Sequence, residues 1–353
     1  MATRALMVLL VAAACAEPVR VRPRALPVTP RAEKPGPPTE RDDAWLFHAA
    51  SEAERVGDAA AARGYYEELL RERPSSGLAD AARFNLGLVF EHGGDYASAA
   101  AVYEPIIVKP MPSDEDARRT WLDAHFRRAA CLSKGGGWQE VSRLFDVVLD
   151  VPGLSVVDRI EALVGRGIAD KERGEAAAAE IAFSQVLHLA RDFDRDSAQG
   201  LSPFVAEAAF HWADIELGRF EGVMLAFPSD MLARRLDEKC ARLLTAQRRY
   251  LRAMHFGDAH TVAAAGNRIG GMYERLYDDI MGLEVPVDFD AEQRAAYRDE
   301  VKRRLRVLVE KAIRVYERTA LVGKRAESAM PWVEKSEAAL ARLRAIVVDE
   351  PAL

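Results

Sequence analysis

The sequence is poor in the features that define several common protein classes. It has three cysteines in 353 residues, too few for a disulfide-rich scaffold. The apolar run at residues 5–11 is shorter than the about 20 residues that a helix needs to cross a bilayer. The formal net charge is -6, so the chain has no excess of positive charge with which to attract a phosphate backbone. These shortages argue against a disulfide-stapled domain, a membrane-spanning helix and a nucleic-acid partner.

The common catalytic and cofactor motifs are also missing. Gly323 and Lys324 are followed by Arg325, whereas a phosphate-binding loop has Ser or Thr there, and neither GxSxG nor HExxH occurs. Glu327 and Ser328 resemble the catalytic Glu-Ser pair of lytic transglycosylases, but only 26 residues follow Glu327, too few for the sugar-binding domain of those enzymes. We therefore predict a non-enzymatic protein without metal, cofactor or small-molecule substrate. A peptidoglycan-associated enzyme or glycan-binding protein is the alternative.

The N-terminal residues have the order of a secretory signal, namely Arg4, an apolar run, and small residues up to Ala14. The stretch VAAACAEP resembles the lipobox of bacterial lipoproteins, in which the cysteine becomes the lipid-bearing first residue. This resemblance implies removal of residues 1–14 and lipidation of Cys15. Ala16 is not the Asp that retains such proteins in the inner membrane, so the resemblance implies an outer-membrane lipoprotein that faces the periplasm. An ordinary secretory signal, with Cys15 incidental, is the alternative.

Residues 15–40 follow as a predicted tether. Residues 16–40 hold seven of the 17 prolines of the chain and show no apolar period. Such a composition favours an extended polyproline-type segment, which rises about 3.1 Å per residue. A tether of this kind would hold the folded body away from the membrane to which the Cys15 lipid attaches.

From residue 41 onward the chain is rich in Ala, Leu, Arg and Glu, which predicts an all-α body. The stretch ARFNLGLVFEHGGDYASAAAVYEPIIVKP combines Leu-Gly, Gly-Asp-Tyr, a small Ala and a closing Pro at offsets that resemble the tetratricopeptide repeat. Four such units are visible, although Arg128 and Arg166 replace the usual Leu in the third and fourth. FVAEAAFHWADIELGRFEGVML is a looser fifth hairpin. The resemblance implies an α-solenoid, a right-handed superhelix of helical hairpins, over residues 41–228.

Residues 229–353 are predicted to form a cap of long helices on the repeat array. The expected helices are residues 229–255, 259–281, a helix that begins at Asp290 with Gln293 in a capping box, and one that begins at Met330. An apolar stripe on the third of these comprises Val301, Leu305, Leu308, Ala312, Val315 and Thr319. It predicts an intramolecular core. A homodimer seam through residues 290–322 is the architectural alternative.

The predicted partner site lies on the first helix of each repeat. Phe47, Phe84 and Phe126 occupy the position that points into the groove of the repeat family, and aromatic anchors suit an extended peptide or a helix. Packing of these rings between neighbouring helices is the alternative. The arrangement resembles tetratricopeptide lipoproteins that serve envelope machines, and residues 250–281 resemble a segment of gliding-motility repeat proteins. We therefore expect an adaptor for an envelope protein or peptide.

Overall fold

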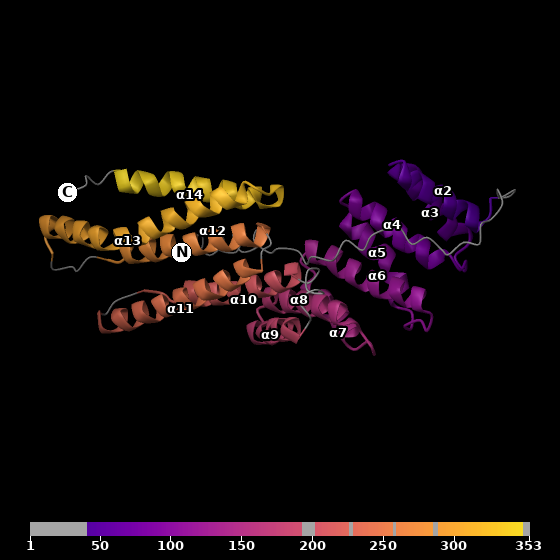
Figure 1. Cartoon of the computed structure of the whole chain (residues 1–353), viewed down its shortest axis with the longest axis horizontal. Coiled ribbons are helices and arrows are strands. Elements are labelled where there is room, and N and C mark those ends of the chain that lie inside the picture. The colour runs from indigo at the N-terminus through magenta and orange to yellow at the C-terminus, as the bar shows by residue number, and fades with distance from the viewer. Residues whose placement is uncertain (1–40, 193–201, 226–228, 257–258, 285–288, 349–353) are drawn as a thin grey trace. The chain divides into compact units, whose positions relative to one another are not determined.

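The computed structural model describes residues 41–192, 202–225, 229–256, 259–284 and 289–348. These residues form helices and loops with no strand among them, which confirms the predicted all-α class. The helices are labelled in Figure 1. The chain divides into two compact units, and the division falls between Ala182 and Phe183. We call them unit 1 and unit 2 and describe each by itself.

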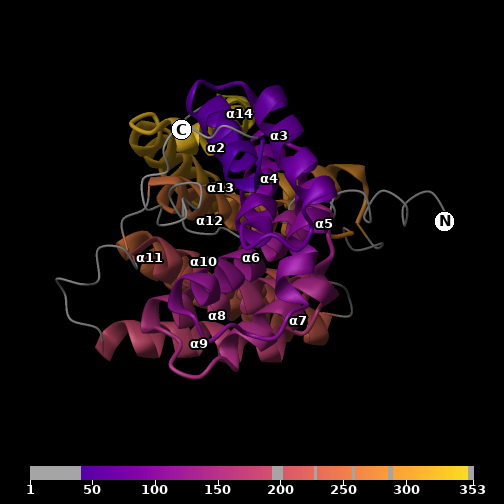
Figure 2. The same cartoon turned by 90° about the vertical axis from the view of Figure 1, so that its right-hand side faces the viewer.

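Unit 1 is built from successive helical hairpins, which appear in Figures 1 and 2 in order along the chain. The helices of the hairpins are α2 (Asp43–Arg55) and α3 (Ala59–Glu72), α4 (Ala79–His92) and α5 (Tyr96–Ile107), α6 (Glu115–Lys134) and α7 (Trp138–Leu149), and α8 (Val156–Glu172) and α9 (Ala176–Asp192). The division between the units lies inside α9. Each of the four repeat units expected from the sequence is thus a pair of helices joined by a short turn.

The turn inside each hairpin has the same backbone geometry. Gly57, Gly94, Gly136 and Gly174 all have positive φ, between 74° and 82°, which is the left-handed region that side chains with a Cβ avoid. The residue after the glycine donates its backbone N–H to a carbonyl in the last turn of the first helix, as Asp95 does to Phe90 at 2.9 Å. The Asp95 carboxylate then caps the next helix by accepting from the Ser98 N–H at 3.0 Å.

The core of unit 1 repeats one aromatic pair. The first-helix ring lies edge-on or tilted against the second-helix ring in three successive hairpins, with centroid distances of 5.7, 5.7 and 5.8 Å. The pairs are Phe47 with Tyr66, Phe84 with Tyr103, and Phe126 with Phe145. The second-helix rings are fully buried. Such ring pairs contribute about 0.5–1.5 kcal/mol beyond the area they bury.

Gly87 allows α4 and α5 to approach closely. A Cβ placed on Gly87 would lie 2.3 Å from Cζ of the Tyr103 ring, a distance that no unstrained contact allows. Tyr103 has no free space to move into because it is fully buried. By contrast, Gly64 in α3 is exposed, and a Cβ there would meet nothing within 4 Å. The two glycines therefore have opposite roles in stability.

We expect Gly87→Ala to destabilise unit 1 by about 1–3 kcal/mol, because the added methyl displaces a packed ring. The matched substitution Gly64→Ala should stabilise the protein by about 0.5–1 kcal/mol, since alanine favours an exposed helix. Native-state hydrogen exchange measures the first effect on the amides of α4 and α5 and the second on the amides of α3. Equal exchange in the two variants would contradict the close contact between Gly87 and Tyr103.

Unit 2 continues with long helices. They are α10 (Ser202–Gly222), α11 (Ser229–His255), α12 (Ala259–Met281), α13 (Ala291–Gly323) and α14 (Met330–Val348), with the 3₁₀ turn η2 (Glu327–Ala329) before α14. The bounds of α11 and α12 and the start of α14 are those predicted. Asp290 and Gln293 form the expected capping box at the start of α13. Because these boundaries are set by local side-chain signals, they were readable from the sequence.

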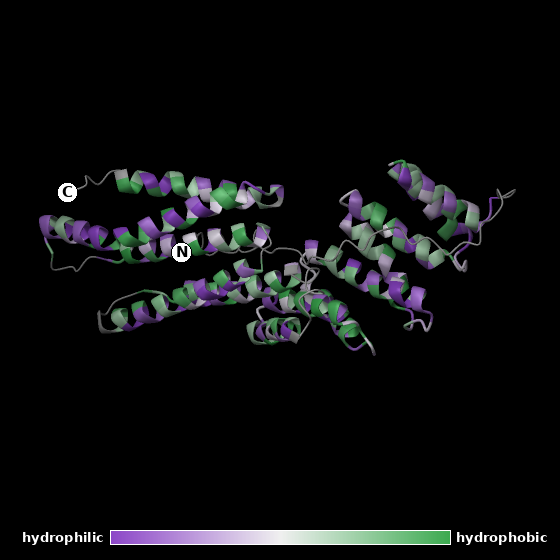
Figure 3. Cartoon of the chain, viewed as in Figure 1, coloured by the Kyte–Doolittle hydropathy of each residue, from purple (hydrophilic) through white to green (hydrophobic). Residues whose placement is uncertain are grey.

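The apolar stripe of α13 packs against α12 within the same chain. Thr319 and Tyr316 lie over Gly266 and Gly270 of α12, where an added Cβ would come within 2.1 and 2.6 Å of them. The buried residues of α13 begin at Val309, whereas Val301 and Leu305 are only half-buried. Figure 3 shows the start of α13 as hydrophilic. The second half of the stripe is thus an intramolecular core, the interpretation that the sequence favoured over a dimer seam.

The end of the repeat region differs from the prediction at the expected fifth hairpin. FVAEAAFHWADIELGRFEGVML does not form a hairpin by itself, because α10 is continuous from Ser202 to Gly222 and packs against α11. No Gly or Pro interrupts residues 204–217, so nothing breaks the helix there. The boundary at residues 228/229 and the capping role of the later helices stay predictions.

Candidate protein-binding surface of the helical repeats

The three predicted anchor residues lie in the core of unit 1. The exposed fractions of Phe47, Phe84 and Phe126 are 4%, 2% and 0%. Each is the first-helix ring of one of the aromatic pairs described above. This is the alternative that the sequence left open, because a ring at this position reaches the second helix of its own hairpin. A binding surface on the first helices therefore has to be built from other residues.

A tyrosine and a glutamate form a repeated polar contact between the two helices of a hairpin. Tyr66 donates its hydroxyl hydrogen to Glu54 at 3.0 Å, and Tyr103 donates to Glu91 at 2.6 Å. In both hairpins the tyrosine follows the glutamate by 12 residues. Burial of the rings requires a partner for each hydroxyl, and these glutamates of the first helices supply it.

Burial also changes how these groups titrate. It raises the pKa of the Tyr103 hydroxyl far above its ordinary value, and the negative charge of Glu91 raises it further. It raises the pKa of Glu54 as well, although the hydrogen bond from Tyr66 opposes the shift. Burial raises the pKa of the nearby Cys131 thiol to about 12, so this cysteine stays protonated and unreactive at neutral pH.

A side chain of the following hairpin also hydrogen-bonds to each of these tyrosine–glutamate pairs. Asn85 of α4 is fully buried and donates through Nδ2 to the Tyr66 hydroxyl at 3.0 Å. Arg127 of α6 donates to Glu91 at 3.1 Å, with both side chains 15% exposed. The contacts form a half-buried polar row across the first helices α2, α4 and α6. The row links neighbouring hairpins and offers charged groups beside the exposed surface.

The two arginines at the usual leucine positions replace apolar packing with ion pairs. Arg128 reaches Glu104 at 3.3 Å and Glu140 at 3.1 Å. Arg166 pairs with Asp146 of α7 and, at 3.0 Å, with Asp170 of its own helix. These long side chains cover the helix contact with their methylene groups and place their charges at its edge. The third and fourth repeats thus depart from the family pattern in chemistry and keep the hairpin geometry.

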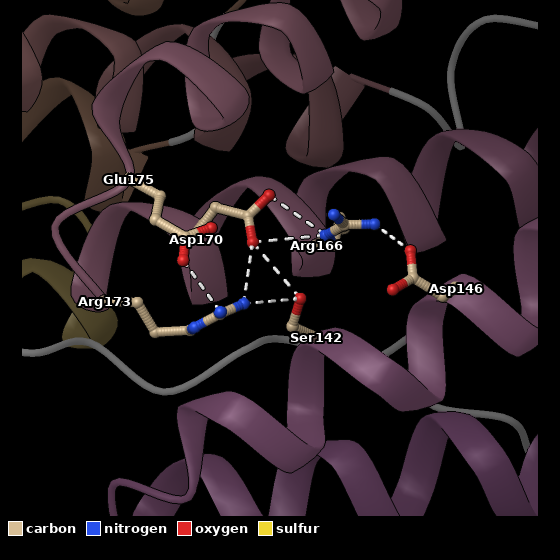
Figure 4. A network of polar contacts seen from close by, with 6 residues as sticks. All are labelled: Ser142, Asp146, Arg166, Asp170, Arg173 and Glu175. Carbon is tan, nitrogen blue, oxygen red and sulfur yellow. Dashed lines mark hydrogen bonds and ion pairs between the residues drawn. The ribbon is translucent and has the colours of Figure 1, made fainter.

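Asp170 is the centre of this network, as Figure 4 shows. Its carboxylate is 1% exposed and accepts hydrogen bonds from Ser142 at 3.2 Å and from Arg166 at 3.0 Å. Arg173 donates to Asp170 at 3.5 Å, to the Ser142 hydroxyl at 3.1 Å and to Glu175 at 2.7 Å. Two guanidinium groups and one hydroxyl therefore compensate one buried carboxylate and tie α7 to α8.

The helices α2, α4 and α6 each end in an exposed Arg, His or Lys side chain. Arg55, His92 and Lys134 end α2, α4 and α6 two residues before the positive-φ glycine of each turn, and all three are exposed. Cationic or histidine side chains at a helix C-terminus favour the helix dipole, which is a sufficient structural reason for them. They also lie at equivalent positions of successive repeats, so they mark one edge of the first-helix surface.

The other sequence candidates give no alternative centre. Cys15 lies outside the described residues. Glu327 lies exposed on η2, and within the described residues no group of three or more His, Cys, Asp or Glu side chains is placed to hold a metal ion. Cys131 and Cys240 are free thiols, Cys131 buried and Cys240 half-buried. None of the described helices is both long and apolar enough to cross a membrane.

Comparison with known families agrees with the hairpin geometry of unit 1. The family model of the tetratricopeptide repeat matches residues 47–110, which include most of α2 and all of α3 to α5. Residues 47–110 are thus similar to tetratricopeptide repeats. The repeat explains the recurring Gly turn and the small residues at the helix contacts. A search of curated proteins gave no match to the chain.

Solved helical-repeat structures are distant neighbours. MamA residues 41 to the end, from Desulfovibrio magneticus RS-1, is 13% identical, with 61% of this chain and 94% of that chain covered at a TM-score of 0.41. A tetratricopeptide repeat protein from Parabacteroides merdae is 14% identical, with 84% and 98% covered at a TM-score of 0.41. A repeat protein from Bacteroides fragilis is 10% identical, with 84% and 98% covered at a TM-score of 0.29.

We expect Asp170→Ala to destabilise the fourth repeat by roughly 2–4 kcal/mol, because it removes the acceptor shared by Ser142, Arg166 and Arg173 from a buried position. The control Asp146→Ala removes a half-exposed partner of Arg166 and should cost less than about 1 kcal/mol. Hydrogen exchange in α7 and α8 reports both changes. A cost for Asp146→Ala as large as that for Asp170→Ala would contradict the central role of the buried carboxylate.

Proposed function

We propose that the protein is a non-enzymatic adaptor of the bacterial cell envelope, anchored by a lipid on Cys15 and able to bind a protein partner on the first-helix surface of its tetratricopeptide repeats. The observation that carries this proposal is the succession of repeat hairpins in unit 1. Stacked hairpins present equivalent side chains at regular intervals, which suits an extended peptide or a helix.

The chemistry of the surface supports a polar, partly charged partner site. Glu54, Glu91 and Arg127 form the half-buried row, and exposed Arg55, His92 and Lys134 follow its edge. Hydrogen-bonded charges that are already held in place lose little conformational entropy when a partner binds. The partner is expected to be an envelope protein or peptide.

The anchor and the location rest on the sequence of the N-terminal residues. The signal-like residues 1–14, the lipobox-like stretch before Cys15 and the proline-rich residues that follow support an outer-membrane lipoprotein facing the periplasm. The narrower likeness of residues 250–281 to gliding-motility repeat proteins supports, within this proposal, an envelope machine of that kind.

A photo-crosslinking residue at position 55, 92 or 134 should capture the same envelope protein in intact cells, because these positions follow one edge of the first-helix surface. Ala101 and Arg143 are exposed on second helices and serve as matched control positions. Mass spectrometry of the crosslinked products identifies the partner. Capture from the control positions with equal yield, or attachment to cell-wall glycan alone, would contradict the adaptor proposal.

Cys15→Ser should abolish labelling by radioactive palmitate and release the protein from the membrane fraction, since the thiol is the atom that carries the diacylglyceryl group. Ala12→Ser is a conservative control that keeps the cysteine. Membrane fractionation and labelling are measured together. Unchanged fractionation of the Cys15 variant would remove the lipoprotein part of the proposal and leave the repeat surface unaffected.

A further inference from the structure

Unit 2 contains an apolar groove, and none of the residues that line it belongs to the segment similar to tetratricopeptide repeats. The groove has a volume of about 900 Å³ and lies where α11, α12 and α13 come together, with all three helices contributing its walls. Its lining residues run from Leu244 to Met254 on α11, from Val262 to Tyr273 on α12, and from Lys311 to Val322 on α13. At 1.5 Å per residue, each wall is roughly 15 Å long, which is about three helical turns.

The α11 wall carries large apolar side chains at the surface. Leu244 and Leu251 are 54% and 51% exposed, although Ile269 beneath them on α12 is only 2% exposed. Single exposed apolar residues are ordinary on protein surfaces. Leu244 and Leu251 lie two turns apart along a groove with a buried apolar floor, and exposed apolar surface of this kind marks interaction sites.

The spacing on each wall is that of a helix-packing seam. On α11 the lining residues are Leu244, Gln247, Leu251 and Met254; on α12 they are Val262, Gly266, Ile269 and Tyr273; on α13 they include Lys311, Val315, Arg318 and Val322. Steps of three and four alternate on every wall. Such seams form the holes that receive the side chains of a packed helix, as in a four-helix bundle.

The charge of the groove is one-sided. Lys311, Arg314 and Arg318 line its α13 wall, and none of its lining residues is acidic, although the chain has a net charge of -6. Lys311 lies 5.4 Å from the centre of the Tyr273 ring. Arg314 is 3.8 Å from Glu310, which already accepts a hydrogen bond from Arg306 at 3.0 Å. Arg318 has no ion pair with any described residue.

We propose that this groove binds an amphipathic helix of a partner protein, with apolar residues at heptad spacing on one face and acidic residues along the edge that meets α13. The apolar face fills the seam above Ile269 and covers Leu244 and Leu251. The acidic edge of the partner helix supplies carboxylates that form ion pairs with Lys311 and Arg318. About three turns of partner helix match the length of the walls.

Other occupants fit the charges less well. A second copy placed symmetrically would bring its own Lys311, Arg314 and Arg318 against the same basic wall. Residues 16–40 of this chain carry five Arg and Lys residues against three Glu, so they are also net positive. Charge complementarity therefore favours an acidic helix from another protein.

The inference does not depend on the proposed repeat surface, which lies in unit 1. If crosslinking from the repeat positions fails, the groove proposal is unaffected. If the groove does not bind the peptide, the proposed repeat surface is unaffected. The two proposals together describe an adaptor with two separate binding surfaces of different chemistry.

The test uses the purified full chain and a fluorescent synthetic peptide of about 18 residues, with Leu at heptad positions a and d, Glu at e and g, and Ala elsewhere. A matched peptide carries Lys in place of each Glu. Fluorescence anisotropy should show binding of the Glu peptide that weakens as salt increases, and much weaker binding of the Lys peptide. Vesicles of phosphatidylglycerol are the third probe.

Groove variants separate the apolar and the charged contributions. The double variant Lys311→Glu and Arg318→Glu should weaken the Glu peptide about tenfold and improve binding of the Lys peptide. The double variant Leu244→Ser and Leu251→Ser should weaken both peptides. The control, Arg298→Glu with Lys302→Glu, changes exposed cations at the start of α13 outside the groove and should alter binding less than twofold.

All these positions are exposed, so the variants should keep the helicity of the protein, which circular dichroism confirms. Equal binding of the Glu and Lys peptides, no binding of either, or equal effects of the groove and control variants would overturn the proposal. Binding of phosphatidylglycerol vesicles with loss in the Lys311 and Arg318 variant, but no peptide binding, would overturn it in favour of a lipid site.

Discussion

The contact of a glycine with an aromatic ring on a neighbouring helix is the constraint on which both units depend. Tyr103 packs on Gly87, Phe145 packs on Gly165, and in unit 2 Tyr316 packs on Gly270, where an added Cβ would come within 2.6 Å of the ring in every case. A side chain at any of these glycines would push two helices apart. The close approach of the two helices also buries the rings. The distance between the helices then determines how the other side chains of each pair pack.

Burial of the tyrosines in turn produces the polar chemistry of the first helices. A hydroxyl without a partner would cost about 1–3 kcal/mol in the core, so Glu54 and Glu91 lie where Tyr66 and Tyr103 reach them. Arg127 then compensates the charge of Glu91 from the next hairpin. The charged row that we propose to bind a partner is thus also a part of the structure, and substitutions in it affect stability and binding together.

The groove of unit 2 differs because the described chain compensates it only in part. Its leucines are exposed and Arg318 has no ion pair there, whereas Asp170 in unit 1 has three donors. The Asp170 network is complete within the chain and stabilises the fold, whereas the exposed leucines and Arg318 of the groove leave a surface that another molecule can cover.

The sequence by itself determined the all-α class, the four hairpins and helix bounds such as Ala259–Met281, because turns, caps and periodicity are local signals. Only the tertiary structure decided that Phe47, Phe84 and Phe126 are core residues, since the exposure of a helix face depends on the neighbouring helices. The tertiary structure also decided which carboxylates pair with Arg166 and which helices form the groove. Those features join residues from two or three helices, and no pattern within one helix specifies how its neighbours are placed.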